Sequence, residues 1–487
     1  MSNMVKLSNI SERIPLYEEV KKSFDEEGNT TITDMSLLPS FRWITMADGT
    51  LVQRLINYDL SKAKETEEVW GEYEKEDLSD LKSKRVKIIS IPYTVDGTKF
   101  KGVAKVSKYN KDNWQAHLKQ IDERQNKLKS KAGMINFEIA QKDVEIDKGK
   151  LKESSKKATE KVKDQVTAHT KLSEYLAQQM LTRQEWIDIS DYSETTSSDV
   201  LMDNFEEAMY QNPLILGVKN IALSKNGHML IVSYEDNQKE FEKKQESIRK
   251  EVKEVAKKIV KDDMSDLQKE FAINQYLIET AKYDDAALEN AEKNQFKNVD
   301  KEFNDSFTPY GVLVNKVGVC ASYAGAFKLL ADEVGLESIV VTGYLDGEVP
   351  HAWNKVKLDN AWHSVDSTNN DNELILNALL NAPKKATKKI LQEDERYLVD
   401  DYLKDYEASD DDKDKEYYHV EKKFFDQKEV AQKLIEGLKK EESITLRTDY
   451  QIDDDDFMSI VKAVNAELRN EDLKGTYWNG VIFLSNK

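Results

Sequence analysis

The pattern of apolar and polar residues in one stretch of the second half of the chain predicts a helix followed by three strands. Apolar or bulky side chains recur there at helical spacing, at Tyr323, Phe327, Leu330 and Val334. Gly335 is a natural end for that helix. Short β-branched or alternating runs follow at 339–344, 351–358 and 362–367, with a tight turn at 359–360. The pattern indicates α+β structure in which a helix packs on an antiparallel sheet.

The alternation also assigns side chains to the faces of two predicted strands. His351 and Trp353 share one face of the first strand, and Asp366 shares a face of the return strand with Ser364. Neighbouring strands lie about 4.8 Å apart, so a hydrogen bond between His351 and Asp366 is expected. His363 is the rival base, but it lies on the opposite face from Asp366 and is interpreted as a packing or surface residue.

Cys320, the single cysteine of the chain, stands at the start of the predicted helix. Unpaired backbone N–H groups and the helix dipole favour an anion there, so a thiolate is stabilised. The backbone N–H of Cys320 is a candidate oxyanion donor, and Gly318 is expected to let the chain turn tightly before the helix. We interpret Cys320 as a thiol nucleophile, His351 as its general base and Asp366 as the group that orients the base.

Three sequence blocks carry a resemblance to a known family. They are Val319-Cys320 with Tyr323, Ala324, Ala326 and Phe327; His351-Ala352-Trp353-Asn354 with Val356; and Trp362 with Val365, Asp366 and Thr368. In this order and spacing they resemble the transglutaminase-like superfamily of papain-like thiol enzymes, in the form found in many bacterial proteins. The resemblance covers roughly residues 250–375. It implies Cys320 as nucleophile, His351 as base and Asp366 as orienting group.

Three departures from the family pattern bear on the site. His363 replaces the aromatic residue usual before Val365-Asp366, Asn369 stands where many relatives have tryptophan, and Lys316 stands where a glycine often precedes the cysteine block. They concern the substrate groove and the side-chain part of the oxyanion hole, whose second donor the sequence does not identify. Tyr323 and Trp353 are the candidate substrate contacts, and core packing is the alternative for Trp353.

The predicted chemistry is acyl transfer at an amide or ester carbonyl of a protein or peptide substrate, with no metal ion and no organic cofactor. Water as the acceptor makes the protein a cysteine peptidase or amidase, and an amine acceptor makes it a transglutaminase. Hydrolysis is the preferred hypothesis, because accessible water is the default acceptor. The alternative from a different class is a non-catalytic scaffold that keeps the fold for adhesion or peptide binding.

Flanking modules are expected on the N-terminal side. Residues 1–108 predict an α/β module, with a short amphipathic helix over 14–24 and two hairpins at Asp48-Gly49 and Asp96-Gly97. Residues 109–185 predict a long helical spacer, either a helical hairpin or a coiled coil, because apolar residues repeat there every seven positions. Such a spacer is a candidate surface for self-association.

Residues 186–240 predict a helix and a hairpin that support the catalytic domain, which is expected to span 241–400. A charged helix over 238–262 is followed by a second helix that Ser265 caps. The end of this second helix, with Tyr283-Asp284, is similar to the helix that precedes the cysteine in the family. A polar loop at 285–308 and a polar helical stretch after Asp366 complete the predicted domain.

An acidic linker is expected at 401–424 and a small module of alternating helices and strands at 425–487. Within the linker, acidic residues echo a calcium-binding loop at Asp410, Asp412, Asp414 and Glu421. Lys415 occupies the place where that loop needs glycine, so a solvated linker is the preferred interpretation and no metal site is predicted.

Composition and length limit the binding partners and the cellular compartment that we expect for this protein. The net charge of −19 argues against nucleic acid and anionic membrane surfaces as partners, and a length of 487 residues predicts a multidomain protein. One cysteine excludes an internal disulfide. No apolar run is long enough to span a bilayer, and no signal peptide follows Met1, so a cytoplasmic protein is expected by default. A secreted or cell-surface protein is the alternative, if the chain is trimmed or exported unconventionally.

Overall fold

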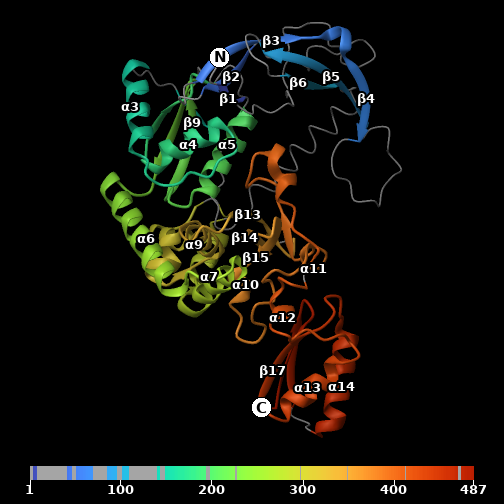
Figure 1. Ribbon diagram of the computed structural model, residues 1–487. Helices are drawn as coiled ribbons and strands as arrows, with labels where there is room; N and C mark the ends of the chain where they lie inside the picture. Colours follow the sequence, from blue (N-terminus) through green and yellow to red (C-terminus); the bar gives the residue numbers. More distant parts are fainter. Residues whose placement is uncertain are drawn as a thin grey trace.

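The chain folds into several sheets and helices of mixed α and β structure, seen in a computed structural model (Figure 1). The structure describes residues 4–7, 41–46, 51–69, 85–95, 101–108, 140–142, 148–192, 198–224, 227–294, 296, 298–347, 349–411, 413–469 and 473–486. Within these residues, no helix is both long and apolar enough to cross a membrane.

Six strands near the N-terminus form one antiparallel sheet in the order β1-β2-β3-β5-β4, with β6 paired to β5. These strands are β1 (Met4–Leu7), β2 (Phe41–Met46), β3 (Leu51–Tyr58), β4 (Lys64–Val69), β5 (Arg85–Val95) and β6 (Lys101–Lys108), with the 3-10 helix η2 (Leu60–Lys62) after β3. Strand β2 pairs with β3 and β5 pairs with β6, which confirms both predicted hairpins. The helix predicted over 14–24 lies outside the described residues.

The long helical spacer predicted over 109–185, either a helical hairpin or a coiled coil, is interrupted in the part that the structure describes. Strand β7 (Ala140–Lys142) is followed by two separate helices, α3 (Lys148–Lys161) and α4 (Lys171–Leu181). Leu151 and Ala158, two positions of the predicted repeat, are buried on α3, which packs against α4. The apolar stripe is therefore covered within the same chain, and tertiary packing decides where the helices end. Self-association through this region stays a prediction.

The helix and hairpin predicted within 186–240 are confirmed. Helix α5 (Ser198–Gln211) precedes the antiparallel pair β9 (Val218–Ser224) and β10 (Met229–Tyr234). Strand β8 (Trp186–Asp188) and the earlier β7 extend this pair to a four-stranded sheet in the order β7-β9-β10-β8. Helices α4 and α5 pack against each other beside this sheet (Figure 1).

Helices α6 (Gln238–Ile259) and α7 (Asp266–Thr280) have the predicted positions, and Ser265 caps α7 through a capping box. The segment predicted as a loop at 285–308 instead contains helix α8 (Asp285–Lys293) and the 3-10 helix η3 (Lys301–Phe307). One turn of π-helix, η4 (Gly311–Asn315), leads to β12 (Val317–Gly318), which pairs in parallel with β11 (Lys282–Tyr283). Helix α9 (Cys320–Glu333) follows and ends just before Gly335, as predicted.

The three predicted strands form an antiparallel sheet under α9. They are β13 (Ser338–Leu345), β14 (Val349–Leu358) and β15 (Ala361–Val365), and β16 (Leu391–Glu393) adds a fourth in the order β15-β14-β13-β16. Asp359 and Asn360 have φ values of 47° and 67°, the conformation that a tight hairpin turn needs. Helix α9 packs on β13 and β14 (Figure 1).

The prediction of a helical stretch after Asp366 is wrong. In the structure this part of the chain has two helices of only four residues each, α10 (Ser367–Asn370) and α11 (Lys384–Thr387). Asn377 and Asn381 both adopt left-handed backbone conformations, with φ values of 59° and 58°, which interrupt a right-handed helix.

The C-terminal part forms a second small α/β unit with its own apolar core. Its elements, after η5 (Asp400–Tyr406) and α12 (Tyr417–Val420), are α13 (Val430–Leu438), β17 (Ser443–Arg447), α14 (Asp454–Leu468), β18 (Lys474–Trp478) and β19 (Val481–Ser485). The predicted alternation of helix and strand is confirmed, and β18 is an additional strand. A buried ion pair of 2.8 Å between Arg447 and Glu416 ties β17 to the start of α12.

One apolar core joins the helix-and-hairpin unit to the segment that carries Cys320. It contains fully buried side chains from α4, α5, α6, α7 and α9, including Leu176, Phe205, Ile248, Leu277 and Phe327. Burial of this kind is the main stabilising contribution to a fold. The domain boundary predicted at residue 240 therefore crosses a shared core and stays a prediction.

Candidate active site

The sequence before Cys320 folds into a tight approach to α9. Lys316, which stands where relatives often have glycine, has a φ of 62°. A Cβ atom on Gly318 would lie 2.6 Å from Oγ of Ser322. The turn is therefore made at Lys316, and Gly318 is needed for close packing, not for the turn that the sequence predicted. Val319, the N-cap residue, offers no side-chain acceptor to the first N–H groups of α9, which leaves the helix N-terminus able to stabilise an anion.

The Cys320 thiol is buried, with 2% of the residue exposed. It packs against Ala324 of its own helix and against Val340 and Ala352 of the sheet, with the Tyr210 ring beside them. A thiol in such surroundings is inert unless a cation or a hydrogen-bond partner activates it. The imidazole of His351 is that partner, because the neighbouring Cys320 thiol is one of the groups that raise the pKa of His351.

The structure brings His351 and Asp366 together as predicted. Nε2 of His351 lies 2.7 Å from Oδ2 of Asp366, and both residues are buried, at 5% and 0% exposure. Asn354 on β14 pairs with Val365 on β15, so Asp366 continues that register opposite Trp353. His351 and Asp366 are thus diagonal neighbours on one face of the sheet.

The charge of the His351 ring follows from its neighbours. Burial lowers the pKa of His351, but the Asp366 carboxylate and the hydrogen bonds to Asp366 and Cys320 outweigh burial and raise the pKa to about 10. An ionised carboxylate only accepts hydrogen bonds, so Nε2 is the donor to Asp366. Nδ1 is then the ring nitrogen left for the thiol, and the ring holds a proton that favours the thiolate.

Asn369 is a site residue that the sequence did not identify as one. Its side-chain amide donates to Oδ2 of Asp366 at 2.7 Å, and its backbone N–H donates to Oδ1 at 3.2 Å. Asp366 is also the N-cap of α10. Both carboxylate oxygens are therefore fixed, which aims the carboxylate at His351. The signal was the departure from tryptophan at this position.

Tyr283 is a second residue that the sequence analysis did not assign to the site. Burial and the nearby negative charges of Cys320, Asp285 and Asp366 raise the pKa of Tyr283 well above its usual value. Its hydroxyl therefore stays protonated and able to donate a hydrogen bond. Tyr283 pairs with Gly318 between β11 and β12, which holds it next to the segment that precedes Cys320.

The two candidate substrate contacts are buried in this structure. Trp353 is 1% exposed, and its indole stacks on the His351 imidazole with ring centroids 5.9 Å apart and an interplanar angle of 21°. Tyr323 is also 1% exposed, and its hydroxyl lies 3.3 Å from Asp371. Contact of either residue with a substrate stays a prediction. His363 pairs with Val356 in the β14–β15 register, on the face opposite to Asp366 as predicted.

Among the described residues, no group of three or more histidine, cysteine, aspartate or glutamate side chains is arranged to hold a metal ion. In the acidic segment predicted as a linker, Asp410 accepts a hydrogen bond from the backbone N–H of Lys385. Glu416 caps α12 and pairs with Arg447. These carboxylates therefore have structural partners.

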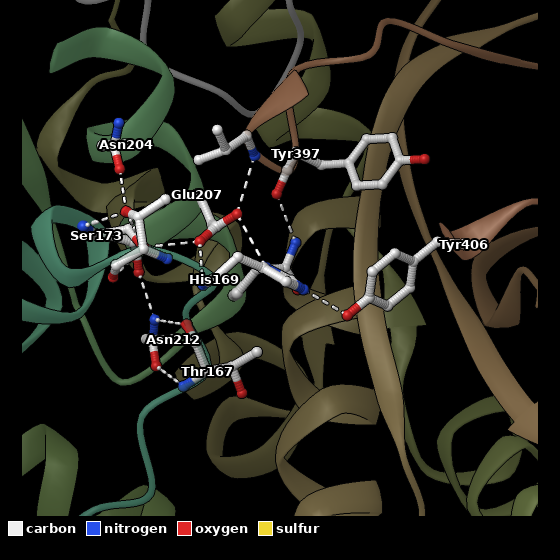
Figure 2. A network of polar contacts seen from close by, with 12 residues as sticks. Thr167, His169, Ser173, Asn204, Glu207, Asn212, Tyr397 and Tyr406 are labelled. Carbon is white, nitrogen blue, oxygen red and sulfur yellow. Dashed lines mark hydrogen bonds and ion pairs between the residues drawn. The ribbon is translucent and has the colours of Figure 1, made fainter. Parts of the chain in front are cut away.

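A second cluster of polar and titratable side chains surrounds Glu207 on α5, the helix of the helix-and-hairpin unit. Figure 2 shows the His169 imidazole between Glu207 of α5 and the Tyr406 phenol, at 3.1 Å and 2.5 Å. The Glu207 carboxylate is buried and also accepts from Oγ of Ser173 at 2.7 Å and from the Val399 backbone N–H at 2.9 Å. The cluster fastens α5 to segments on both sides of it in the sequence.

The segment around Cys320 is similar to a known protein family. Residues 253–367 match the family model described as the transglutaminase-like superfamily. The chain therefore contains a domain of the transglutaminase-like superfamily, the class that the three sequence blocks indicate.

The curated relatives are larger proteins. The chain is similar to kyphoscoliosis peptidase of Mus musculus, with 27% identity over 135 residues that cover 26% of this chain and 19% of that protein. It is also similar to kyphoscoliosis peptidase of Homo sapiens, with 29% identity over 126 residues that cover 24% and 17% of the two proteins. The chain thus spans less than a fifth of the length of these relatives.

The chain is also similar to solved structures. One of them is described as a crystal structure of a TGase, with 15% sequence identity and a TM-score of 0.23. The match covers 57% of this chain and 65% of that chain.

Proposed function

We propose that this protein is a thiol enzyme that transfers acyl groups from protein or peptide amides, and that it acts as a cysteine peptidase or amidase. The observation that carries the proposal is the 2.7 Å pair of His351 and Asp366 beside the single cysteine at the start of α9. Cysteine nucleophiles are activated by such a base, which a third group orients.

The proposed reaction has two steps. The Cys320 thiolate attacks the amide carbonyl, His351 gives its proton to the departing amine, and an acyl thioester remains. Water then attacks the thioester, His351 accepts a proton from the water, and the carboxylic acid is released with the thiol restored. The backbone N–H of Cys320 and the Tyr283 hydroxyl are the proposed donors to the oxyanion.

Hydrolysis and transamidation differ only in the molecule that attacks the thioester. Trp353 stacks on His351 and holds the ring in place, and this role requires no direct contact with substrate. Because the acyl group is already activated as a thioester of Cys320, an amine that attacks this thioester would form a new amide, which is a crosslink. Water is the more abundant acceptor, so we propose hydrolysis.

The test is incubation of wild type and Cys320→Ala with a peptide mixture, with and without a fluorescent primary amine, followed by mass spectrometry. The proposal expects new peptide termini with wild type and none with Cys320→Ala. Amine-labelled glutamine residues without cleavage would replace hydrolysis by transamidation. Neither product, together with an unactivated thiol, would favour the non-catalytic scaffold.

A further inference from the structure

An apolar pocket with a volume of about 150 Å³ lies next to the candidate active site. Its walls come from α5, the start of β9 and the end of β10, from α8, η3 and the segment between them, and from α9 with β13 and β14. The lining includes large apolar side chains from the first two walls: Met209, Tyr210, Ile215, Phe296, Val299 and Phe307. The segment at 285–308 therefore forms one side of a cavity beside the nucleophile.

The pocket adjoins the Cys320 side chain. Ala321 directly follows Cys320 on α9, Ala352 directly follows His351 on β14, and both line the pocket. Cys320 and Ala352 also pack in one apolar cluster with Val340, another lining residue. Because Cys320 packs against two residues that line the pocket, a side chain next to an acyl group held at Cys320 is within reach of this pocket.

The residues that line the pocket disfavour a charged ligand group. Glu235 is the one carboxylate among the described lining residues, and it lies 3.5 Å from the Lys219 ammonium. Burial raises the pKa of Tyr210 well above its usual value, so its phenol stays neutral. Apolar cavities of about 150 Å³ hold benzene. The pocket therefore has the size and polarity for one aromatic ring or one large aliphatic side chain.

We propose that this pocket, here called the acyl-side pocket, binds a large apolar side chain of the acyl donor next to the amide that Cys320 attacks. The inference rests on the proposed function and adds its substrate class, which is peptides with an aromatic or large aliphatic residue beside the reacting amide. A charged residue there would lose its hydration without gaining a partner, which disfavours binding.

Buried polar contacts hold the α5 wall in place before any ligand binds. Gln211 of α5 donates to the backbone carbonyls of Val340 and Tyr397 at 2.8 Å each, and it accepts from the Val340 N–H at 2.9 Å. Four residues earlier, Glu207 is fixed by the cluster around His169 (Figure 2). Met209 and Tyr210 lie between these two anchors, so the pocket is formed in advance.

The test uses alkylation of Cys320 by two reagents, N-benzyl iodoacetamide and iodoacetamide, followed by intact-protein mass spectrometry. The single cysteine ensures that each adduct reports on this site. The measured quantity is the ratio of the two rates. The variant is Met209→Trp, which fills the pocket from α5. The matched control is Met202→Trp, because Met202 lies on the same helix and packs against the same core but does not line the pocket.

We expect the benzyl reagent to react about tenfold to a hundredfold faster than iodoacetamide and to show saturation, since apolar burial of a ring is worth that much. Met209→Trp should bring the ratio close to one, and Met202→Trp should preserve it. If Met209→Trp does not fold, Phe307→Ala replaces it and should shift the preference to a larger, naphthyl reagent.

Equal rates for the two reagents, or a ratio that Met209→Trp and Phe307→Ala leave unchanged, would overturn the inference. Because the ratio compares two reagents on one thiol, it can be measured at about pH 9 even if Cys320 is an ordinary, unactivated thiol. Failure of the proposed function is read separately, from the pH dependence of the iodoacetamide rate alone.

Discussion

Nε2 of His351 on β14 lies 2.7 Å from Oδ2 of Asp366, the residue that directly follows β15, although the two residues are not directly opposite each other. This hydrogen bond fixes which ring nitrogen faces the thiol and which charge the ring carries. With a pKa of about 10, the imidazole is protonated at neutral pH. A protonated ring beside Cys320 stabilises a thiolate, the form that attacks a carbonyl.

The raised pKa of His351 predicts a pH-dependent contribution to stability. An unfolded histidine titrates near 6.5, and His351 in the folded protein has a pKa of about 10. Since the folded pKa is the higher one, the protonated ring stabilises the fold fully below about pH 6.5, and this contribution is lost as pH rises through about 10. Urea unfolding of wild type and His351→Gln should show a stability difference that shrinks over this window. A difference that grows with pH would contradict the assignment of charge.

Asn369→Ala is predicted to weaken the site without removing any of the three reacting groups. The variant removes the side-chain donor to Oδ2 of Asp366 and keeps the backbone donor to Oδ1, so the carboxylate is held less firmly toward His351. A hydrogen bond to a charged group is worth about 1.5–3 kcal/mol, so alkylation of Cys320 near pH 6 should slow roughly tenfold. Asn372→Ala is the control, because Asn372 is exposed and accepts only from nearby backbone N–H groups. Equal rates in the two variants would remove Asn369 from the site.

Glu207→Gln is predicted to lower the free energy of unfolding by about 1–3 kcal/mol, because a carboxamide cannot accept all the hydrogen bonds that the carboxylate accepts. Burial raises the pKa of Glu207, but the His169 ring and the backbone N–H donors of Val399 and His169 outweigh burial and lower it. The stabilisation is therefore present above about pH 4.5 and lost as pH falls through the folded pKa.

Urea unfolding at about pH 7 and at acidic pH measures the effect of Glu207→Gln. Glu254→Gln is the control, because the Glu254 side chain is 62% exposed and its ion pair with Lys250 is long, at 3.9 Å. If both variants lose the same stability at pH 7, Glu207 is not an anchor of α5.

Arg447→Met is predicted to destabilise the junction between α12 and the C-terminal unit. Arg447 and Glu416 are both fully buried, and removal of the guanidinium leaves the Glu416 carboxylate without its cation. Breaking one side of a buried pair costs about 3–5 kcal/mol, whereas replacing both partners with uncharged side chains costs much less. Thermal unfolding should show Arg447→Met below the double variant Arg447→Met/Glu416→Gln in stability. The reverse order would exclude an uncompensated charge as the cause.

The sequence correctly predicted those elements in which the spacing of apolar residues and the residues at the ends and turns favour the same structure. Helix α9 has helical spacing and a glycine at its end, and the turn at Asp359-Asn360 has residues that tolerate a positive φ. The period of two along strands assigned His351 and Asp366 to faces of their strands, and their hydrogen bond was expected from the strand spacing. The register that makes them diagonal neighbours comes from the structure.

The predictions from the sequence were wrong or incomplete where contacts between residues far apart in the chain determine the structure. The seven-residue repeat at Leu151 and Ala158 is typical of a coiled coil, but both residues are buried on α3, which packs against α4 and β8 of the same chain. Asn369 and Tyr283 reach the site only because the fold brings α10 and β11 to it, and neither residue type identifies such a role by itself. The acyl-side pocket combines three separated segments, so no local pattern predicts it.

The most direct test of the central claim is the pH dependence of Cys320 alkylation by iodoacetamide, in wild type and in His351→Ala. An ordinary thiol titrates near ~8.5, and a thiolate paired with an imidazolium reacts well below that pH. We predict fast alkylation at about pH 6 in wild type and its loss in His351→Ala. A rate in wild type that follows an ordinary thiol, or that His351→Ala leaves unchanged, would contradict the ion pair and the proposed enzyme with it.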